Sequence, residues 1–418
     1  MIDFEHHPVV AQTAMMIEQM AQSMMRPVAR EMDEHEHEDP TAYINFMYDV
    51  MKSGAGGAAA TQFTGGSRKK DKDADPNAPK KPGFGNVLGA VSIEMMSWGD
   101  AGIYLATPVA GLGGAAVAAA GTDEQKERFL KRFNEGEPKW GAMAITEPGC
   151  GSDSAAITTT AKLEGDHYVL NGHKIFVTSG KRAIKDSNGF VVVWATVDKS
   201  AGRAGIKSFV VEAGTPGMTL LGLEKKHGIR CSDTAQIVFE NCRVPKENLL
   251  GSAEVDRNKG FKGVMATFDA TRPAVAASAI GIGRAALEFV KEELDKAGVK
   301  IRYGINPHKL TARERDVMEM EANLKAAWLL TLKAAWMSDN KKHNNLEASI
   351  CKAKAGLAVT HLTQKAVELM GPLGYSRELL LEKWMRDAKI NDIFEGTQQI
   401  NMLIIARRVL GYGRDQLK

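Results

Sequence analysis

The spacing of apolar residues changes twice along the chain, and this change restricts the possible folds more than any other feature. Residues 8 to about 50 and 88–136 carry the period of amphipathic helices, whereas residues from about 140 to 250 form short β-rich runs. After residue 255 the period is helical again. The order predicts an α+β multidomain fold rather than alternating βαβ units.

Three domains follow from these zones. We expect an N-terminal helical domain over residues 1–137, a middle antiparallel β-barrel or sandwich over 138–252, and a C-terminal four-helix bundle over 253–418. Thr122 with Gln125 three residues later predicts a capped helix start in the first domain. Turn residues separate the β runs of the second: Gly165-Asp166, Asn171-Gly172, Gly202 to Gly205, and Pro245.

Apolar stripes with helical spacing define the C-terminal bundle. One stripe comprises Ile280, Gly283, Leu287, Val290 and Leu294, and a second comprises Val317, Met320, Leu324, Trp328 and Thr331. Two further helical stretches, roughly 346–370 and 397–411, complete the four helices.

Composition excludes several classes of protein. Apolar residues make up 44% and charged residues 25% of the 418 residues, and the net charge of +3 gives no reason to expect a nucleic-acid partner. The N-terminus has no signal pattern, and no run of 18 uncharged apolar residues exists, so we expect neither secretion nor a membrane span. The scattered cysteines are typical of reduced thiols in a cytoplasmic protein: Cys150, Cys231, Cys242 and Cys351.

Three segments have simple structural interpretations. The Gly-, Pro- and Lys-rich residues 65–85 predict a mobile surface loop over about 54–85, with a docking patch for an acidic partner as the alternative. GLGGAAVAAAG (111–121) lacks the preceding strand of a dinucleotide-binding loop, so a helix junction is favoured. EHEHED (34–39) is typical of a solvated helix end, and we predict no metal site there.

Two stretches are suited to chemistry. In MAITEPGCGSDSAA (143–156) an apolar strand runs into glycines and hydroxyls, which can either cradle an anionic or carbonyl-rich ligand or form a tight interstrand turn. In FEGTQQI (394–400) a carboxylate lies on a short turn among apolar residues.

Together, AITEPGCGSDSAA and EKWMRDAKINDIFEGTQQI resemble the two signature stretches of the acyl-CoA dehydrogenase family, in its FAD-dependent bacterial type. GTDEQKERFL, YVLNGHKIFVTSG, IRCSDTAQIVFENCRVPKENLLG and FDATRPAVAA are further matches in the family's order. The resemblance covers about residues 95–298 and 313–411, and it implies the same helix–barrel–helix fold.

The resemblance also implies FAD-dependent α,β-desaturation of an acyl-CoA thioester. Glu395 matches the catalytic base, and Glu395 and Gly396 match the turn that presents base and backbone N–H to the substrate. Thr271 stands where other family members carry the base, so the role falls to Glu395. Arg272 matches a substrate-binding position, as does Ser152.

The same carry-over gives the FAD contacts. The matching positions on the first strand edge are Ala144, Ile145 and Thr146, and those in the turn after it are Gly151 and Ser152. Phe176 and Thr178 match the strand that covers the flavin, and Thr397 and Gln399 follow the catalytic turn. For Phe176 a place in the barrel core is the alternative. Glu368 and Gly371 match a segment that reaches the adenine half from a neighbouring subunit.

Two departures from the family pattern affect these expectations. The N-terminal PxxYGGxG segment, which walls part of the acyl pocket, is replaced by the Lys/Gly/Pro-rich loop. Residues 300–314 replace a stretch that grips FAD across the subunit boundary; Lys300 and Tyr303 are stand-ins, and Pro307 interrupts the helix.

The resemblance leaves three functions open. The first is a dehydrogenase that passes electrons to an electron-transfer flavoprotein. The others are an acyl-CoA oxidase, whose relatives usually carry a further C-terminal domain, and a non-catalytic partner subunit of a mixed assembly. We expect a homo-oligomer, a dimer or tetramer, with a hetero-oligomer as the alternative. The residues do not indicate the acyl chain.

Overall fold

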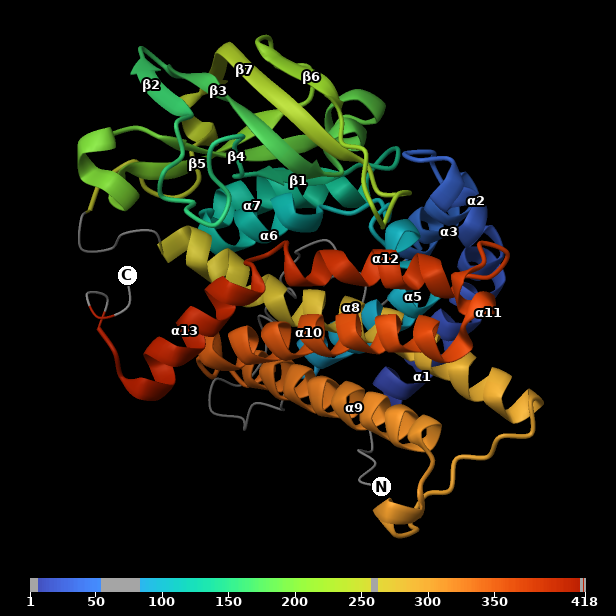
Figure 1. The fold of residues 1–418 in the computed structure, drawn as a ribbon. Coiled ribbons are helices and arrows are strands. Elements are labelled where there is room, and N and C mark those ends of the chain that lie inside the picture. The colour runs from blue at the N-terminus through green and yellow to red at the C-terminus, as the bar shows by residue number, and fades with distance from the viewer. Residues whose placement is uncertain (1–6, 54–82, 257–261, 414–415, 417–418) are drawn as a thin grey trace.

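A computed structural model describes residues 7–53, 83–256, 262–413 and 416. A curled sheet lies over two short helices and a layer of long helices (Figure 1). The predicted mobile loop of about 54–85 lies almost entirely outside the described residues.

The N-terminal domain is helical, as predicted. Thr122 and Gln125 form the expected capping box, because each side chain accepts a hydrogen bond from the other's backbone N–H. The glycine-rich segment is helical over Gly111–Ala120 and extended at Gly121, and a Cβ at Gly113 would lie 2.6 Å from the Ala142 carbonyl oxygen. The helices are α1 (Pro8–Met20), α2 (Ala29–Glu34), α3 (Thr41–Lys52), α5 (Gly85–Tyr104), α6 (Gly111–Ala120) and α7 (Asp123–Leu130).

The middle domain is a seven-stranded sheet with path β1-β4-β2-β3-β7-β6, and β5 pairs with β4. Most pairs are antiparallel, but β1 and β2 both run parallel to β4, which the sequence pattern did not indicate. The strands are β1 (Gly141–Ala144), β2 (Thr160–Glu164), β3 (His167–Thr178), β4 (Phe190–Thr196), β5 (Ile206–Glu212), β6 (Met218–Leu223) and β7 (Thr234–Pro245).

The predicted turn at Asn171-Gly172 is wrong. Both residues lie inside β3, where the register against β7 shifts between Leu170 and Gly172. A Cβ at Gly172 would lie 2.2 Å from Thr159 Oγ1, so the glycine lets Thr159, just before β2, approach the bulged strand closely. By contrast, Gly165 has φ +62° and joins β2 to β3 as predicted.

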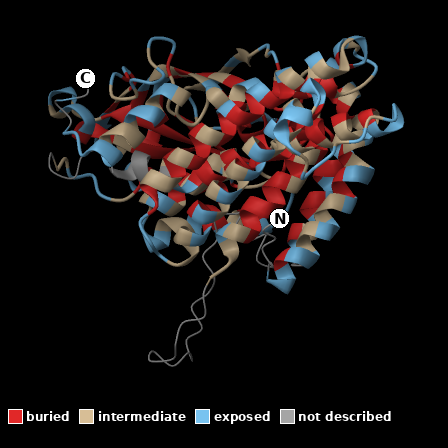
Figure 2. Cartoon of the chain, turned by 60° about the horizontal axis from the view of Figure 1, so that its bottom comes forward, coloured by how far each residue is buried: buried red, intermediate tan, exposed pale blue. Residues whose placement is uncertain are grey.

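In the described part of the C-terminal domain we find the four predicted helices and two more that the sequence interpretation missed. The predicted ones are α8 (Lys262–Lys296), α9 (Ala312–Asp339), α10 (Asn345–Met370) and α13 (Gln398–Leu410), and the additional ones are α11 (Pro372–Tyr375) and α12 (Leu381–Lys389). One described segment, Ala270–Lys296, is long and apolar enough to cross a membrane, yet 72% of its most apolar window is buried inside the bundle. Figure 2 shows buried residues concentrated on the inner faces of the helices and in the sheet.

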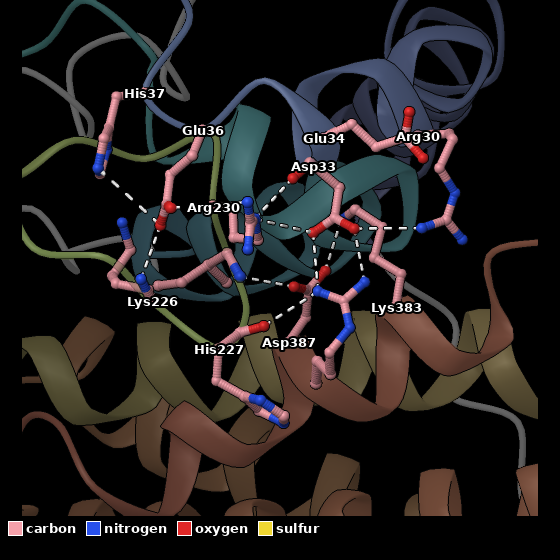
Figure 3. A network of polar contacts seen from close by, with 12 residues as sticks. Arg30, Asp33, Glu34, Glu36, His37, Lys226, His227, Arg230, Lys383 and Asp387 are labelled. Atoms are coloured by element: carbon pink, nitrogen blue, oxygen red, sulfur yellow. Dashed lines mark hydrogen bonds and ion pairs between the residues drawn. The ribbon is translucent and has the colours of Figure 1, made fainter. Parts of the chain in front are cut away.

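An ionic network joins the three domains (Figure 3). Arg386 of α12 donates to both carboxylate oxygens of Asp33 in α2, at 2.9 and 2.5 Å, and to the carbonyl of His227 between β6 and β7. Beside it, Lys383 is 2.5 Å from Asp100 Oδ2 and 2.6 Å from Asp387 Oδ2, and all three side chains are buried.

The EHEHED segment is only in part the solvated face expected. His35 and Glu38 are exposed. Glu36, however, accepts a 2.7 Å hydrogen bond from the Lys226 backbone N–H, and Asp39 accepts one of the same length from Arg182 Nε. The segment therefore contacts the middle domain.

Candidate active site

Glu395 lies on a tight turn between the 3₁₀ turn Ile390–Asp392 and α13. Glu395 has φ +54° and Gly396 has φ +91°. Glycine adopts such a backbone readily, whereas a glutamate does so at an energetic cost, and such strain is concentrated at functional sites. Thr397 caps α13 by accepting a 3.2 Å hydrogen bond from the Ile400 N–H, which fixes where the turn ends.

The Glu395 carboxyl group is enclosed by α8 and α10 but remains accessible from a cavity. Burial raises the pKa of Glu395 above that of an ordinary glutamate. A 2.8 Å hydrogen bond from Thr271 Oγ1 to Glu395 Oε2 and the positive charges of Arg272 and Lys352 act in the opposite direction. The site thus holds a carboxylate of increased basicity, suited to removing a proton from carbon.

Two side chains that the sequence interpretation missed hold the turn. Lys352 Nζ of α10 donates to the Gly396 carbonyl at 2.5 Å, and Asn401 Nδ2 of α13 donates to the same oxygen at 2.9 Å. Both residues are buried. The available signal was a lysine on the apolar face of a predicted core helix.

The opposite wall of the cavity comes from β1, β3 and the loop after β1. Phe176 is 58% exposed with φ +56°, so the alternative of a core aromatic is wrong. Of the predicted cofactor residues, those that line the cavity are Ile145, Thr146, Gly151, Ser152, Phe176, Thr178 and Thr397. Ala144 is fully buried in β1, and Gln399 is exposed on α13; among the described residues neither side chain lines the cavity.

A buried ion pair fixes this loop. Lys174 Nζ is 2.8 Å from Glu147 Oε1 and also donates to the Ile145 carbonyl at 2.9 Å. Glu147 accepts four more hydrogen bonds, from the backbone N–H and hydroxyl groups of Thr158 and Thr159. Burial opposes ionisation, but Lys174 and these donors lower the pKa of Glu147 to about 2. These contacts hold Glu147 in place, and reciprocal backbone hydrogen bonds between Glu147 and Cys150 form the tight turn given above as the alternative; the glycine and the hydroxyl after it form the cradle.

The cavity between the two walls has a volume of about 2310 Å³. Arg272, Glu395 and Gly396 line it from one side. Cationic side chains also reach its wall: Arg203, Lys225, Lys226, Arg386, Lys389 and Arg407.

Four predicted cofactor residues lie away from this cavity in the described chain. Tyr303 Oη donates to Glu321 Oε2 at 2.6 Å in the region that joins α8 and α9, which also contains Lys300. Glu368 pairs with Lys365, and Gly371 caps α10 with φ +55°. Lys300, Tyr303, Glu368 and Gly371 could reach a cofactor only in a neighbouring subunit, so their roles stay predictions.

Fold and site together define an enzyme class. A basic carboxylate and an exposed aromatic side chain line the same cavity between a curled sheet and a helical bundle. This arrangement is suited to an oxidoreductase that removes a proton and a hydride from one bound substrate.

Comparison with known proteins identifies the family. The chain matches the models for the acyl-CoA dehydrogenase N-terminal domain over residues 11–137, middle domain over 142–242 and C-terminal domain over 258–410. It belongs to the acyl-CoA dehydrogenase family and is an oxidoreductase that acts in acyl-CoA dehydrogenation.

Relatives cover most of the chain. The short-chain specific acyl-CoA dehydrogenase of Clostridium acetobutylicum is 33% identical over 94% of this chain and 96% of its own. The acryloyl-CoA reductase (NADH) of Anaerotignum propionicum is 34% identical over 94% and 92%. The butyryl-CoA dehydrogenase structure from Megasphaera elsdenii superposes with a TM-score of 0.81 at 31% identity, covering 98% of this chain and 100% of that one.

Proposed function

We propose that the chain oxidises an acyl-CoA thioester to the trans-2-enoyl-CoA with FAD and passes the electrons to an electron-transfer flavoprotein. The observation that carries the proposal is Glu395, a half-buried base on a strained turn at the cavity wall. A related chain, with a TM-score of 0.78 at 31% identity and covering 98% of this chain and 100% of its own, comes from a study of the electron transferring flavoprotein of Acidaminococcus fermentans.

The residues on the sheet side fit FAD. Phe176 exposes its ring to the cavity from a positive-φ position, which offers an apolar face to a planar ring system. Gly151 and Ser152 are exposed in the cradle that Glu147 and Lys174 hold, so their backbone and hydroxyl groups can contact polar edges. When bound, FAD supplies the acceptor for the hydride that leaves substrate carbon 3.

Glu395 performs the proton transfer. Its carboxylate takes the proton from substrate carbon 2, and the electron pair of that C–H bond becomes the carbon 2–carbon 3 double bond as hydride leaves carbon 3. The backbone N–H of Glu395 on the same turn can polarise the thioester carbonyl as negative charge develops on its oxygen. Arg272 contributes a positive charge to the same wall.

The cationic wall is suited to the phosphates of the two nucleotide-containing ligands, FAD and CoA. Arg side chains bind phosphate with paired donors and Lys side chains bind it as point charges. Arg203, Arg407 and Lys389 lie on this wall. The presence of Glu395 at the cavity wall favours a catalytic chain over a non-catalytic partner subunit.

The experiment is anaerobic titration of purified protein with acyl-CoAs of increasing chain length. We expect a flavin absorbance spectrum that bleaches with at least one thioester and recovers rapidly with electron-transfer flavoprotein but slowly with oxygen. Rapid recovery in oxygen with stoichiometric peroxide would show an oxidase instead. A flavin that no thioester bleaches would favour the partner-subunit alternative.

We also propose a homo-oligomer that forms through the C-terminal bundle. Apolar side chains are exposed there on α9, α10 and α13, namely Leu329, Trp336, Leu357, Met402, Leu403, Val409 and Leu410. Exposed apolar area of this kind is typical of an interface.

The proposed homo-oligomer is tested by expressing the chain alone and measuring its mass in solution and its flavin content. We expect an oligomer with one FAD per chain. A folded monomer that holds FAD tightly would contradict the shared site, and an oligomer that fills with FAD only beside a homologous chain would show a mixed assembly.

A cytoplasmic location is a further proposal. Its support is that Cys150, Cys231, Cys242 and Cys351 are free thiols. Recovery of the protein in the membrane or secreted fraction of cells would contradict it.

A further inference from the structure

Lys352 is a lysine in an unusual place. It lies in the first half of α10, is 1% exposed, and has the buried residues Cys351 and Ala353 as neighbours. Burying an ammonium group costs free energy unless it is paired, so a lysine here needs a function that an apolar residue could not supply.

Its nitrogen points at the catalytic turn. Lys352 Nζ donates to the Gly396 carbonyl, one residue after the base, at 2.5 Å. Charged groups that act on it are Asp392 and Glu395 on the turn side and Arg272 on α8. Asp392 is engaged elsewhere, by Thr360 Oγ1 at 2.9 Å and Lys389 Nζ at 3.0 Å. Burial lowers the pKa of Lys352 to about 8, although Asp392 and Glu395 oppose this effect.

We propose that Lys352 is a positioning residue that holds the Glu395–Gly396 turn in place from α10 and uses its charge to keep Glu395 ionised. The proposal rests on the proposed function, because it assigns to Glu395 the role of base.

The geometric part follows from the backbone of the turn. Glu395 has positive φ, a conformation that the surrounding structure must impose on a residue other than glycine. The Gly396 carbonyl is the point where α10 and α13 act together, since Lys352 and Asn401 both donate to it. Loosening this point moves the carboxylate relative to the substrate, and misplacement of a reacting group by about 1 Å can cost about 10²-fold in rate.

The electrostatic part of the proposal concerns Lys352 alone and distinguishes its role from that of Asn401. Both side chains donate a hydrogen bond to the same oxygen, but only Lys352 brings a positive charge. That charge favours the carboxylate form of Glu395, whereas burial favours the neutral acid. If Lys352 acted only as a hydrogen-bond donor to the Gly396 carbonyl, replacing it would not change the pH at which Glu395 ionises.

The test compares pH profiles of kcat/KM for the wild type and Lys352→Met, Lys352→Arg and Asn401→Ala. We expect Lys352→Met to lower kcat by about 10-fold or more and to move the acid limb of the profile to higher pH. Lys352→Arg should restore the acid limb because the charge is kept. Asn401→Ala should lower kcat without moving that limb, since it removes a neutral donor.

Exchange of the carbon 2 hydrogen of acyl-CoA in D₂O, followed by mass spectrometry, reports the proton transfer separately from turnover. Its pH dependence should move with that of kcat/KM in Lys352→Met. An acid limb that stays in place in Lys352→Met would overturn the proposal, provided that the wild type bleaches with substrate. If the wild type does not bleach, the proposed function itself has failed.

Should Lys352→Met not fold, the wild type and Lys352→Arg still decide the question. Deprotonation of Lys352 should give the wild type an alkaline limb near pH 8. Arginine stays protonated, so Lys352→Arg should lose that limb. An alkaline limb identical in both proteins would count against the proposal.

Discussion

Glu395→Gln is expected to lose turnover by about 10²–10⁴-fold or more while the protein keeps its flavin. Glutamine matches glutamate in shape and can still accept from Thr271, whose Oγ1 lies 2.8 Å from Glu395 Oε2. It cannot, however, take a proton from carbon 2. Steady-state kinetics and anaerobic flavin bleaching by the best acyl-CoA of the wild type give the measurement.

The control for this variant is Glu378→Gln. Glu378 is exposed and lies between α11 and α12, so its neutralisation should leave bleaching at the wild-type rate. Near-normal bleaching in Glu395→Gln would remove Glu395 from the role of base. In the wild type, activity should fall as pH falls through the raised pKa of Glu395, because protonation abolishes the base.

Of all the substitutions proposed for this chain, we expect Lys383→Met to lower the free energy of unfolding the most. The substitution leaves Asp100 and Asp387 buried with no cation between them, although each still accepts a backbone N–H, from Ile103 and Ile229. Breaking a buried ionic group by removing one partner typically costs about 3–5 kcal/mol. Urea unfolding of the two proteins, followed by circular dichroism, measures the difference.

Two further variants test whether the unpaired buried carboxylates cause the loss of stability in Lys383→Met. Lys246→Met removes an exposed ion pair with Asp166 and should change the unfolding midpoint little. Adding Asp100→Asn to Lys383→Met should recover part of the loss, because one of the two unpaired charges is then gone. A midpoint for Lys383→Met equal to that of Lys246→Met would show that the buried cluster contributes no net stability.

The domain order could be predicted because it depends on local periodicity. The capping box at Thr122 and the stripe from Ile280 to Leu294 are likewise properties of short segments, and both are present. Asn171-Gly172 gave a wrong turn because the same dipeptide suits a hairpin or a bulge, and only the Thr159 side chain packed against Gly172 decides between them. The parallel β1–β4 pair joins strands that are distant in sequence, which no local pattern encodes.

In the candidate site, too, the residues within local motifs could be predicted, and the contacts between distant segments could not. Glu395, Phe176 and the segment from Thr146 to Ser152 lie in motifs that the resemblance covers, and the structure brings them to one cavity. Lys352 was missed because its partner Gly396 is 44 residues away in the sequence. Glu147 and Lys174, 27 residues apart, form a pair that only the folded sheet creates.

The ionic network between the domains has a consequence for the order of events at the ribosome. Asp33 is separated from Arg386 by 353 residues, and Asp100 from Lys383 by 283. At about 5–20 residues per second, synthesis takes about 18–70 s to travel from Asp33 to its partner. During that interval Asp33 has Arg30 of its own helix but lacks Arg386, and Asp100 lacks Lys383. We expect the nascent N-terminal domain to stay protease-sensitive until α12 has left the exit tunnel.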